Sequence, residues 1–337
     1  MNALALRPVF VWLEITGLCN LKCRHCYADS SPQGDHGDMT DGDWFRVMDE
    51  LKVLGVRDVQ FIGGEPTLHP GLPAFIRHAL KCGMRVEVFS NMTHIRDEVW
   101  EVLQLPNVRV AFSYYSDTPE DHDDVTENRG SHARTRANVD KARELGIEMR
   151  GSVINVLQAQ RGDYASHELL QLGIRDVRTD GIRPFGRGAQ GATPSLGRLC
   201  GRCGRGKFAI SPRGEVWPCV FARWMPVGNV HTQSLTDIYD GDEMRNVRGV
   251  LEEAFPHTKA QPSSCLPDMC TPNCNPSFET CNPQLACVPD AQCGPTGSNG
   301  DGDGGEGSGK RITAQPVRMS PRRSVRYHNP GVSDTDC

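Results

Sequence analysis

The sequence predicts an α/β fold, in which a parallel sheet with helical crossovers is followed by a small cysteine-rich domain. Apolar segments of strand length alternate with amphipathic segments of helix length over residues 1–190. Four of the helical segments end at a glycine that an apolar segment follows at once. This alternation favours a parallel sheet, because parallel neighbours need crossover connections.

Six strands are expected in this part, with five helices between them. The strands are expected at residues 9–16, 59–62, 86–89, 108–115, 153–156 and around Val177. Trp44, Met48 and Leu51 fall at i, i+4 and i+7 of the first helix, and residues 75–80 form a similar stripe in the second. The third helix is expected at residues 97–103.

Glycines mark the expected helix ends. A glycine just past a helix takes the left-handed conformation that closes the last turn. Gly55, Gly83, Gly146 and Gly173 have that place, and Pro106 stands instead of a glycine after the third helix.

Composition narrows the class of protein. A chain of 337 residues has room for one large domain and a smaller one. Its net charge of -5 gives no indication of a nucleic-acid partner, and no apolar run reaches the roughly 18 residues of a membrane span. We see no signal peptide, so the 14 cysteines favour metal ligands over disulfides, in a reducing compartment such as the cytoplasm.

Three cysteines lie on one short loop after the first expected strand. Cys19, Cys23 and Cys26 form a C-x3-C-x2-C pattern. Three thiolates can bind three irons of a [4Fe-4S] cluster and leave the fourth iron without a protein ligand. A structural zinc site needs four ligands, and His25 is the only local candidate for the fourth, so the spacing favours the cluster.

A glycine turn follows the second expected strand. It reads Gly63, Gly64, Glu65, Pro66. Two glycines let the backbone approach a ligand closely, which a Cβ would prevent. Alone, the same four residues also fit an ordinary turn between a strand and a helix.

Together the two motifs resemble the signature of the radical S-adenosylmethionine (SAM) superfamily. In that family the open iron chelates the amino and carboxylate groups of SAM, and the GGEP motif receives the amino group. The resemblance implies a partial (β/α)6 barrel with its ligands at the C-terminal ends of the strands. Family members often hold the ribose or the methionyl carboxylate with polar residues after the third and fourth strands, which implies Asn91 and Ser113 here. The sequence departs from the family pattern directly after Ser113, where Tyr114 to Asp117 replace the usual ending of the fourth strand.

A second group of cysteines begins at Cys200. Cys200 and Cys203 precede an expected strand pair at residues 207–210 and 215–218, which Cys219 ends. With Gly214 five residues before Cys219 and Gly-Asn-Val at 228–230, this order resembles the SPASM domain, an auxiliary iron-sulfur module of many radical SAM enzymes that modify peptides. Six cysteines follow: Cys265, Cys270, Cys274, Cys281, Cys287 and Cys293.

The number of auxiliary clusters stays open at this point. Two fully ligated [4Fe-4S] clusters need eight cysteines, and residues 200–293 hold nine. The resemblance implies that Cys200, Cys203 and Cys219 share the first cluster with one later cysteine, and that four others hold the second. The distal spacing departs from the usual SPASM pattern, so a single cluster or a zinc ribbon stays an alternative. Cys82, on an apolar helix face, is expected to be a core residue.

The expected domains are therefore a radical SAM partial barrel at 1–190, a SPASM-like domain at 191–293, and a Gly-rich linker with a disordered tail at 294–337. The resemblance implies reductive cleavage of SAM to methionine and a 5'-deoxyadenosyl radical, which takes hydrogen from the substrate. It also implies electron supply by a reductant such as flavodoxin or ferredoxin.

The leading hypothesis is maturation of a ribosomally made peptide, by a thioether or carbon-carbon crosslink or by epimerisation. Because the first strand begins by about Val9, a separate leader-peptide recognition protein is an expected partner. Two alternatives remain: a radical SAM dehydrogenase or epimerase acting on a small-molecule antibiotic or cofactor precursor, and an iron-sulfur electron-transfer protein without SAM chemistry.

Overall fold

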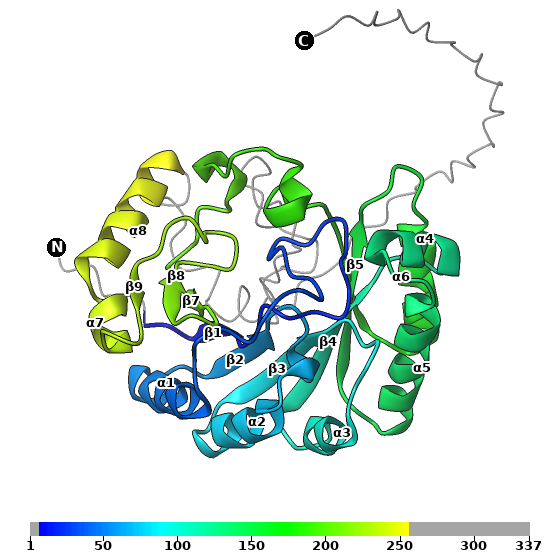
Figure 1. Cartoon of the computed structure of the whole chain (residues 1–337), viewed down its shortest axis with the longest axis horizontal. Coiled ribbons are helices and arrows are strands. Elements are labelled where there is room, and N and C mark those ends of the chain that lie inside the picture. The colour runs from blue at the N-terminus through cyan, green and yellow to red at the C-terminus, as the bar shows by residue number, and fades with distance from the viewer. Residues whose placement is uncertain (1–6, 256–337) are drawn as a thin grey trace, which may run out of the picture. The chain divides into compact units, whose positions relative to one another are not determined.

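The computed structural model describes residues 7–255, and their nine strands form a single sheet (Figure 1). The strand order is β6-β5-β4-β3-β2-β1-β7-β8-β9. The first six strands are parallel, and each pairs with the next one along the chain. Their bounds are β1 Phe10–Glu14, β2 Asp58–Ile62, β3 Arg85–Ser90, β4 Val108–Tyr114, β5 Met149–Asn155 and β6 Asp176–Gly181.

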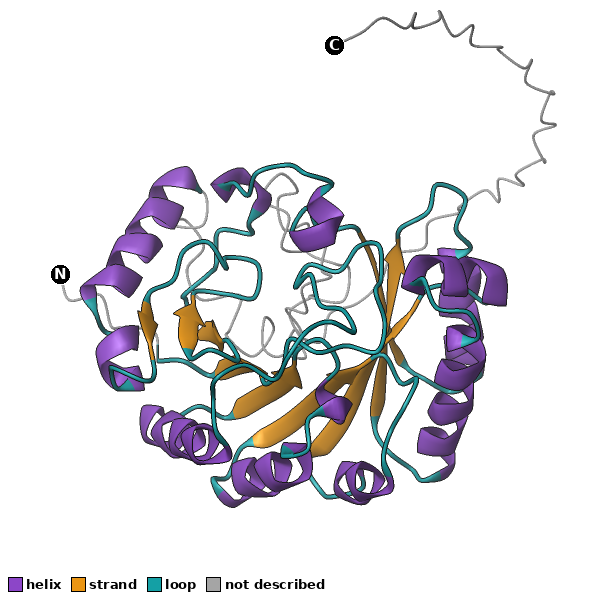
Figure 2. Cartoon of the chain, in the orientation of Figure 1, coloured by secondary structure: helices purple, strands orange, loops and turns teal. Residues whose placement is uncertain are grey.

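Helices cover the outer face of this curved sheet (Figure 2). They are α1 Asp41–Leu54, α2 Leu72–Lys81, α3 Asp97–Leu103, α4 Pro119–Thr126, α5 Ser131–Glu144 and α6 Gly162–Gln171. The parallel α/β fold is thus confirmed, but the expected number of helices is wrong, since β4 and β5 are joined by two. Pro119 begins α4, and Asp123 then bonds the first turn of α5 through Ser131 and the His132 N–H.

The predicted helix ends are confirmed. Gly55, Gly83, Gly146 and Gly173 all have φ between 69° and 85°. After α3, Asn107 takes the left-handed conformation at φ 64°, directly behind Pro106. Asparagine tolerates this conformation better than most residues, so it replaces the missing glycine.

The core has one part on each face of the sheet. Between sheet and helices lie the predicted stripe residues Trp44, Met48 and Leu51, all fully buried. The inner face carries a second cluster with Phe10 and Trp12 of β1. Every residue of β1 and β2 is buried, including the polar Glu14, Asp58 and Gln60, because both faces of these inner strands are covered.

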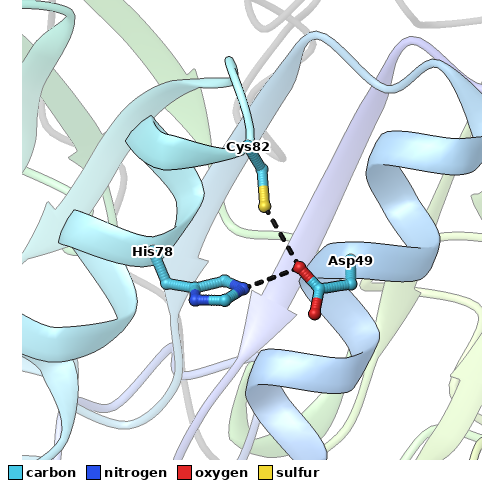
Figure 3. Close-up of side chains that lie close together, drawn as sticks. All are labelled: Asp49, His78 and Cys82. Atoms are coloured by element: carbon cyan, nitrogen blue, oxygen red, sulfur yellow. Dashed lines mark hydrogen bonds and ion pairs between the residues drawn. The ribbon is translucent and has the colours of Figure 1, made fainter.

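Cys82 departs from its expected place. It packs against the core only in part, and its thiol lies 3.4 Å from Asp49 Oδ1 on α1 (Figure 3). The prediction of an ordinary core cysteine is therefore wrong, because the end of α2 turns this side chain toward the surface between two helices.

The cysteine-rich part extends the same sheet. β7 (Lys207–Ile210) pairs in parallel with β1, and the predicted hairpin continues through β8 (Glu215–Trp217) to β9 (Gly228–Asn229). Two helices follow, α7 Leu235–Tyr239 and α8 Asp242–Ala254. Short 3-10 turns lie at Pro66–Leu68, Gly186–Ala189 and Leu196–Arg198.

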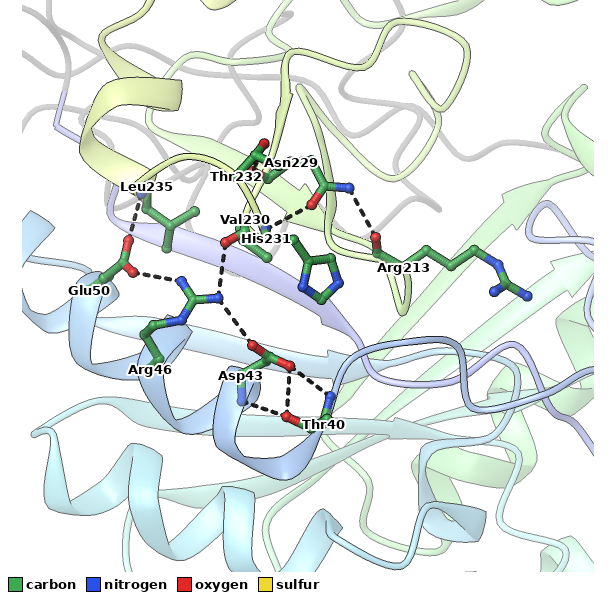
Figure 4. Close-up of polar contacts among 10 residues, drawn as sticks. All are labelled: Thr40, Asp43, Arg46, Glu50, Arg213, Asn229, Val230, His231, Thr232 and Leu235. Atoms are coloured by element: carbon green, nitrogen blue, oxygen red, sulfur yellow. Dashed lines mark hydrogen bonds and ion pairs between the residues drawn. The ribbon is translucent and has the colours of Figure 1, made fainter.

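Polar contacts fix the segment after β9 onto α1 (Figure 4). The Arg46 guanidinium donates to the Val230 carbonyl at 2.9 Å and pairs with Glu50 at 2.9 Å. Glu50 in turn accepts the Leu235 N–H at 2.6 Å. Side chains of α1 thus bond the backbone of the loop after β9 and the first residue of α7.

Several expectations fall on residues that the structure does not describe, 1–6 and 256–337. They include the cysteines from Cys265 to Cys293 and the Gly-rich tail. The bounds of the three expected domains stay predictions. Within residues 7–255, no helix has the length and apolar character needed to cross a membrane.

Candidate functional site

The predicted SAM-site residues meet at the C-terminal ends of β1 to β4. One cavity there is lined by all three cysteines of the first loop. Two strand-end candidates, Asn91 and Ser113, line it as well, together with Gly63 and Gly64. Glu65 and Pro66 are buried and lie behind this lining.

The three thiols of the loop are too widely spaced for one zinc ion. Two sulfurs bound to one zinc lie at most about 4.6 Å apart, twice the Zn–S distance. Metal ligands in proteins include cysteine sulfurs, histidine nitrogens and carboxylate oxygens. Within residues 7–255, the only three of these atoms that lie within 4.8 Å of one another belong to Asp49, His78 and Cys82. Cys19, Cys23 and Cys26 therefore fit a larger group with several metal ions, as a [4Fe-4S] cluster is.

Burial also sets the protonation of the loop. It raises the pKa of the Cys23 thiol to about 12 and raises that of Cys19 further. Cysteine binds metal as the thiolate. Binding of a cluster would therefore displace the protons of these two thiols.

Gly63 and Gly64 allow close contact with the cysteine loop itself. A Cβ on Gly64 would lie 2.2 Å from the Leu18 carbonyl oxygen, and one on Gly63 would lie 2.4 Å from that of Thr16. The Gly64 N–H donates to Thr16 at 2.7 Å and the Glu65 N–H to Leu18 at 2.8 Å. The glycines thus dock the turn onto the loop that carries the cysteines.

Gly64→Ala is expected to lower the free energy of unfolding by about 1–3 kcal/mol or more, because the new methyl group must displace the backbone. Urea unfolding followed by circular dichroism measures this change. Gly197→Ala is the matched control, since a Cβ at Gly197 meets no atom within 4 Å. Equal stability of the two variants would contradict the docking role.

Glu65 connects two strand ends through its carboxylate. It accepts hydrogen bonds from the Ser90 hydroxyl at 2.8 Å and the Asn91 N–H at 2.7 Å, and it also bonds Thr67. Burial raises the pKa of this carboxyl. Its bonds hold the end of β3, and with it Asn91, beside the glycine turn.

Asn91 is held beside a cysteine of the loop. Its Nδ2 donates to Asn20 at 2.9 Å and lies 3.8 Å from Cys19 Sγ. Its Oδ1 accepts from Thr93. With both ends of the amide fixed, the side chain has one orientation at the wall of the cavity.

Tyr115 is a site residue that the sequence did not reveal. Its hydroxyl is hydrogen-bonded to the Cys23 thiol and to Ser113, and its ring packs edge-on against His25 at 5.1 Å. Burial lowers the pKa of His25 to about 4, so its imidazole is neutral at pH 7. Tyr115 was visible only as a departure from the usual strand ending, and no local pattern connects it to Cys23.

Tyr115→Phe is expected to lower the reduction potential of a cluster bound to the first loop by an amount on the order of 50 mV. The hydroxyl stabilises the more negative, reduced form, and its loss removes one hydrogen bond to a ligand sulfur. A redox titration monitored by electron paramagnetic resonance measures the shift. Tyr114→Phe is the control, because the Tyr114 hydroxyl bonds His132 and Glu168 instead. An unchanged potential would contradict this role.

Arg187 holds the cysteine loop in place. Its guanidinium donates to the carbonyls of Cys23 at 2.8 Å and Ser30 at 2.7 Å and pairs with Asp29. Of the arginines after the sixth strand, Arg183 pairs with Asp180 instead. The structure thus gives Arg187 a positioning role for the cysteine loop.

A second cavity adjoins the first on the inner face of the sheet. Both are lined by His25, Tyr27, Ile62, Phe89 and Ser113. The second extends along β5 and β6 with a largely apolar wall and a few polar groups. Its further lining residues are Gln60, Ile154, Asp180, Gly181, Arg183 and Phe221.

The second group of cysteines lies on the loops around β7 and β8. Cys203 and Cys219 are buried with their sulfurs 3.0 Å apart, and Cys200 is hydrogen-bonded to Cys203. The ring centroids of Tyr27 and Phe221 lie 5.2 Å apart. Tyr27 directly follows Cys26, and Phe221 lies two residues after Cys219. This aromatic contact therefore joins the surroundings of the two cysteine groups.

A buried ion pair joins the same two regions. Arg223 binds both oxygens of Glu14, at 2.6 and 2.7 Å, at the C-terminal end of β1. Glu14 is 1% exposed, so its charge depends on this partner. The segment after Cys219 is thereby fixed at the mouth of the barrel.

Comparison with known proteins agrees with this geometry. The family model of the radical SAM superfamily matches residues 13–158, and that of the iron-sulfur cluster-binding domain SPASM matches residues 200–275. The solved structure of Streptococcus suis SuiB bound to S-adenosylmethionine superposes with a TM-score of 0.60 at 16% identity, over 72% of this chain and 68% of that one.

Curated relatives are similar over part of their length. The antilisterial bacteriocin subtilosin biosynthesis protein AlbA of Bacillus subtilis is 26% identical over 271 residues, which are 69% of this chain and 60% of AlbA. The sporulation killing factor maturation protein SkfB of the same bacterium is 32% identical over 141 residues, 42% of this chain and 34% of SkfB. The chain thus spans less than two thirds of either relative.

Proposed function

Since this chain belongs to the radical SAM superfamily and carries an iron-sulfur cluster-binding SPASM domain, we propose that it matures a ribosomally made peptide. The expected change in the peptide is a thioether or carbon-carbon crosslink, or an epimerised residue. [4Fe-4S] and SAM binding follow from the family, whereas the peptide substrate is our proposal.

The observation that carries the proposal is the pair of adjoining cavities. The first is lined by a cysteine triad that leaves one iron of a cluster open, and the second shares five wall residues with it. A substrate group in the second cavity would lie next to SAM in the first. The apolar wall suits a peptide side chain, and Gln60, Asp180 and Arg183 suit polar groups of its backbone.

The names of the relatives support the same substrate class. AlbA takes part in bacteriocin biosynthesis, SkfB is a maturation protein, and a third relative, 26% identical over 170 residues, is the PqqA peptide cyclase of Rhodopseudomonas palustris.

The residues of this chain would position and shield the reaction. When bound, the cluster and SAM supply a 5'-deoxyadenosyl radical that removes hydrogen from an unactivated carbon. Cys19, Cys23 and Cys26 would hold the cluster. Gly63, Gly64, Asn91 and Ser113 at the cavity wall would hold SAM, with Glu65 and Pro66 supporting the turn from behind. The buried surroundings exclude water, which protects a reactive species from side reactions.

Further parts of the proposal concern electrons and partners. We assign two auxiliary [4Fe-4S] clusters to the cysteines between Cys200 and Cys293, since nine cysteines exceed the eight required. A flavodoxin or ferredoxin would supply electrons, and a separate protein would recognise the leader peptide. A reducing cytoplasm suits such thiolate clusters.

The test combines SAM cleavage with product analysis. The anaerobically reconstituted, dithionite-reduced protein is incubated with SAM and a short precursor peptide encoded beside its gene, and 5'-deoxyadenosine and peptide mass are followed by mass spectrometry. Deoxyadenosine with a peptide 2 Da lighter supports a crosslink, and incorporation of solvent deuterium without loss of mass supports epimerisation. About 12 irons per chain supports two auxiliary clusters. Cleavage of SAM with turnover of a small molecule and an unchanged peptide would overturn the peptide assignment.

A further inference from the structure

Three different metal-ligating side chains meet on the outer helices, away from both cavities. Asp49 comes from α1, while His78 and Cys82 come from α2 and its end (Figure 3). Asp49 Oδ1 lies 2.8 Å from His78 Nε2 and 3.4 Å from Cys82 Sγ, and the three ligand atoms lie within 4.8 Å of one another. None of the three residues lines either cavity.

The helices explain why the side chains converge. His78 and Cys82 are four residues apart, so they lie on one face of α2, one turn after the other. Phe45 of α1 packs against the His78 ring at 4.9 Å and against Phe75 at 5.7 Å. This packing holds α1 beside α2 and turns Nε2 of the imidazole toward Asp49.

A catalytic cysteine does not fit this arrangement. Burial and the Asp49 carboxylate raise the pKa of the Cys82 thiol, so it stays protonated at pH 7. The His78 imidazole bonds the Asp49 carboxylate rather than the thiol. A nucleophile needs an effective adjacent base or a lowered pKa, whereas Cys82 has a raised pKa and contacts only the weakly basic Asp49 carboxylate.

The ligand set instead suits a borderline-soft divalent ion. Zinc takes cysteine sulfur at about 2.3 Å and histidine nitrogen or carboxylate oxygen at about 2.0–2.2 Å. Ligand atoms around one such ion lie roughly 3.3–3.7 Å apart, so small side-chain rotations would suffice here. The hydrogen bond from His78 lowers the pKa of Asp49, which keeps its carboxylate ionised and able to bind a cation.

We propose that Asp49, His78 and Cys82 bind one zinc ion between α1 and α2, with water as the fourth ligand. Asp49 is exposed and the other two are half-buried, so solvent reaches the open position. Binding releases the Cys82 thiol proton to solvent, and the His78 proton moves from Nε2 to Nδ1 so that Nε2 is free for the metal. The two hydrogen bonds to Asp49 are replaced by bonds to the metal. The ion would join the two helices from outside and would exchange with solvent.

Zinc content tests the proposal on the full-length, cluster-reconstituted protein. The protein is incubated with zinc chloride and dialysed, and its zinc is measured by inductively coupled plasma mass spectrometry. The wild type should bind about one more zinc ion per chain than Cys82→Ala or His78→Ala. His167→Ala is the matched control, because His167 is an exposed histidine on a helix, four residues after Asp163, and residue 171, one turn further on, is Gln171 rather than a cysteine. It should retain the wild-type zinc.

Alkylation of Cys82 provides a second measurement that needs no variant. Zinc should slow the reaction of its peptide with iodoacetamide at least about tenfold, because the metal occupies the sulfur. Equal zinc in the wild type and Cys82→Ala, with alkylation unaffected by zinc, would overturn the proposal. Neither readout depends on SAM cleavage, so the outcome is independent of the proposed function.

Discussion

Replacing Cys19, Cys23 and Cys26 together by alanine is expected to abolish SAM cleavage while the iron bound by the second cysteine group remains. SAM chelation requires an open iron, and this triad is the set of ligands that leaves one open. The measurement is 5'-deoxyadenosine by mass spectrometry, together with iron content, on reconstituted protein. We expect no deoxyadenosine above the background without enzyme.

The iron count shows whether the two cysteine groups bind iron independently of each other. About four irons should be lost from each chain, because one cluster of four disappears. Cys337→Ala is a matched control, since Cys337 lies outside both cysteine groups of the sequence. Loss of all iron in the triple variant would contradict the division of the cysteines into two independent groups.

The fold was largely predictable because its signals are local. Alternating apolar segments and glycines such as Gly55 and Gly83 give strand and helix ends from a few neighbouring residues. The second helix between β4 and β5 was missed because Pro119 and Asp123 act over a single turn, without a long apolar stripe. The pairing of β7 with β1 was also missed, since it joins segments almost 200 residues apart.

The site residues were predictable only where they belong to a recognised sequence motif. Cys19, Cys23, Cys26 and the glycine turn belong to motifs, and the structure brings them to one cavity. Tyr115 and the Asp49, His78, Cys82 group depend on contacts between separate elements, which leave no spacing pattern. The reason why residue 64 must be a glycine is likewise visible only in the structure, because a Cβ there would meet the Leu18 carbonyl.

A charged network inside the barrel should have a large effect on stability. Glu87 on β3 is 2% exposed and pairs with Arg150 at 2.8 Å and with Arg109 at 2.8 Å. Arg150 is itself 1% exposed, and one of its terminal nitrogens is buried without a hydrogen-bond partner. One buried cation, Arg150, and one half-buried cation, Arg109, thus depend on one carboxylate.

Glu87→Gln is therefore expected to lower the free energy of unfolding by about 3–5 kcal/mol, because it leaves the buried Arg150 guanidinium without a counter-charge. Urea unfolding measures the change, and Glu101→Gln is the matched control. Glu101 lies 3.9 Å from Arg77 and its side chain is 71% exposed, so its pair is worth at most about 1 kcal/mol. A loss at Glu87 as small as that at Glu101 would contradict the network's role.

The pH dependence gives an independent check on the same carboxylate. Burial acts to raise the pKa of Glu87, but Arg150 and Arg109 outweigh it, and the pKa falls below its usual value of 4.5. A lowered pKa in the folded state stabilises the protein above the unfolded pKa, and this contribution is lost as pH falls through the folded pKa. The stability difference between wild type and Glu87→Gln should therefore be constant above about pH 5.5 and shrink below pH 4.5. A difference that is independent of pH would mean that Glu87 contributes through packing, because only its charge is sensitive to protons.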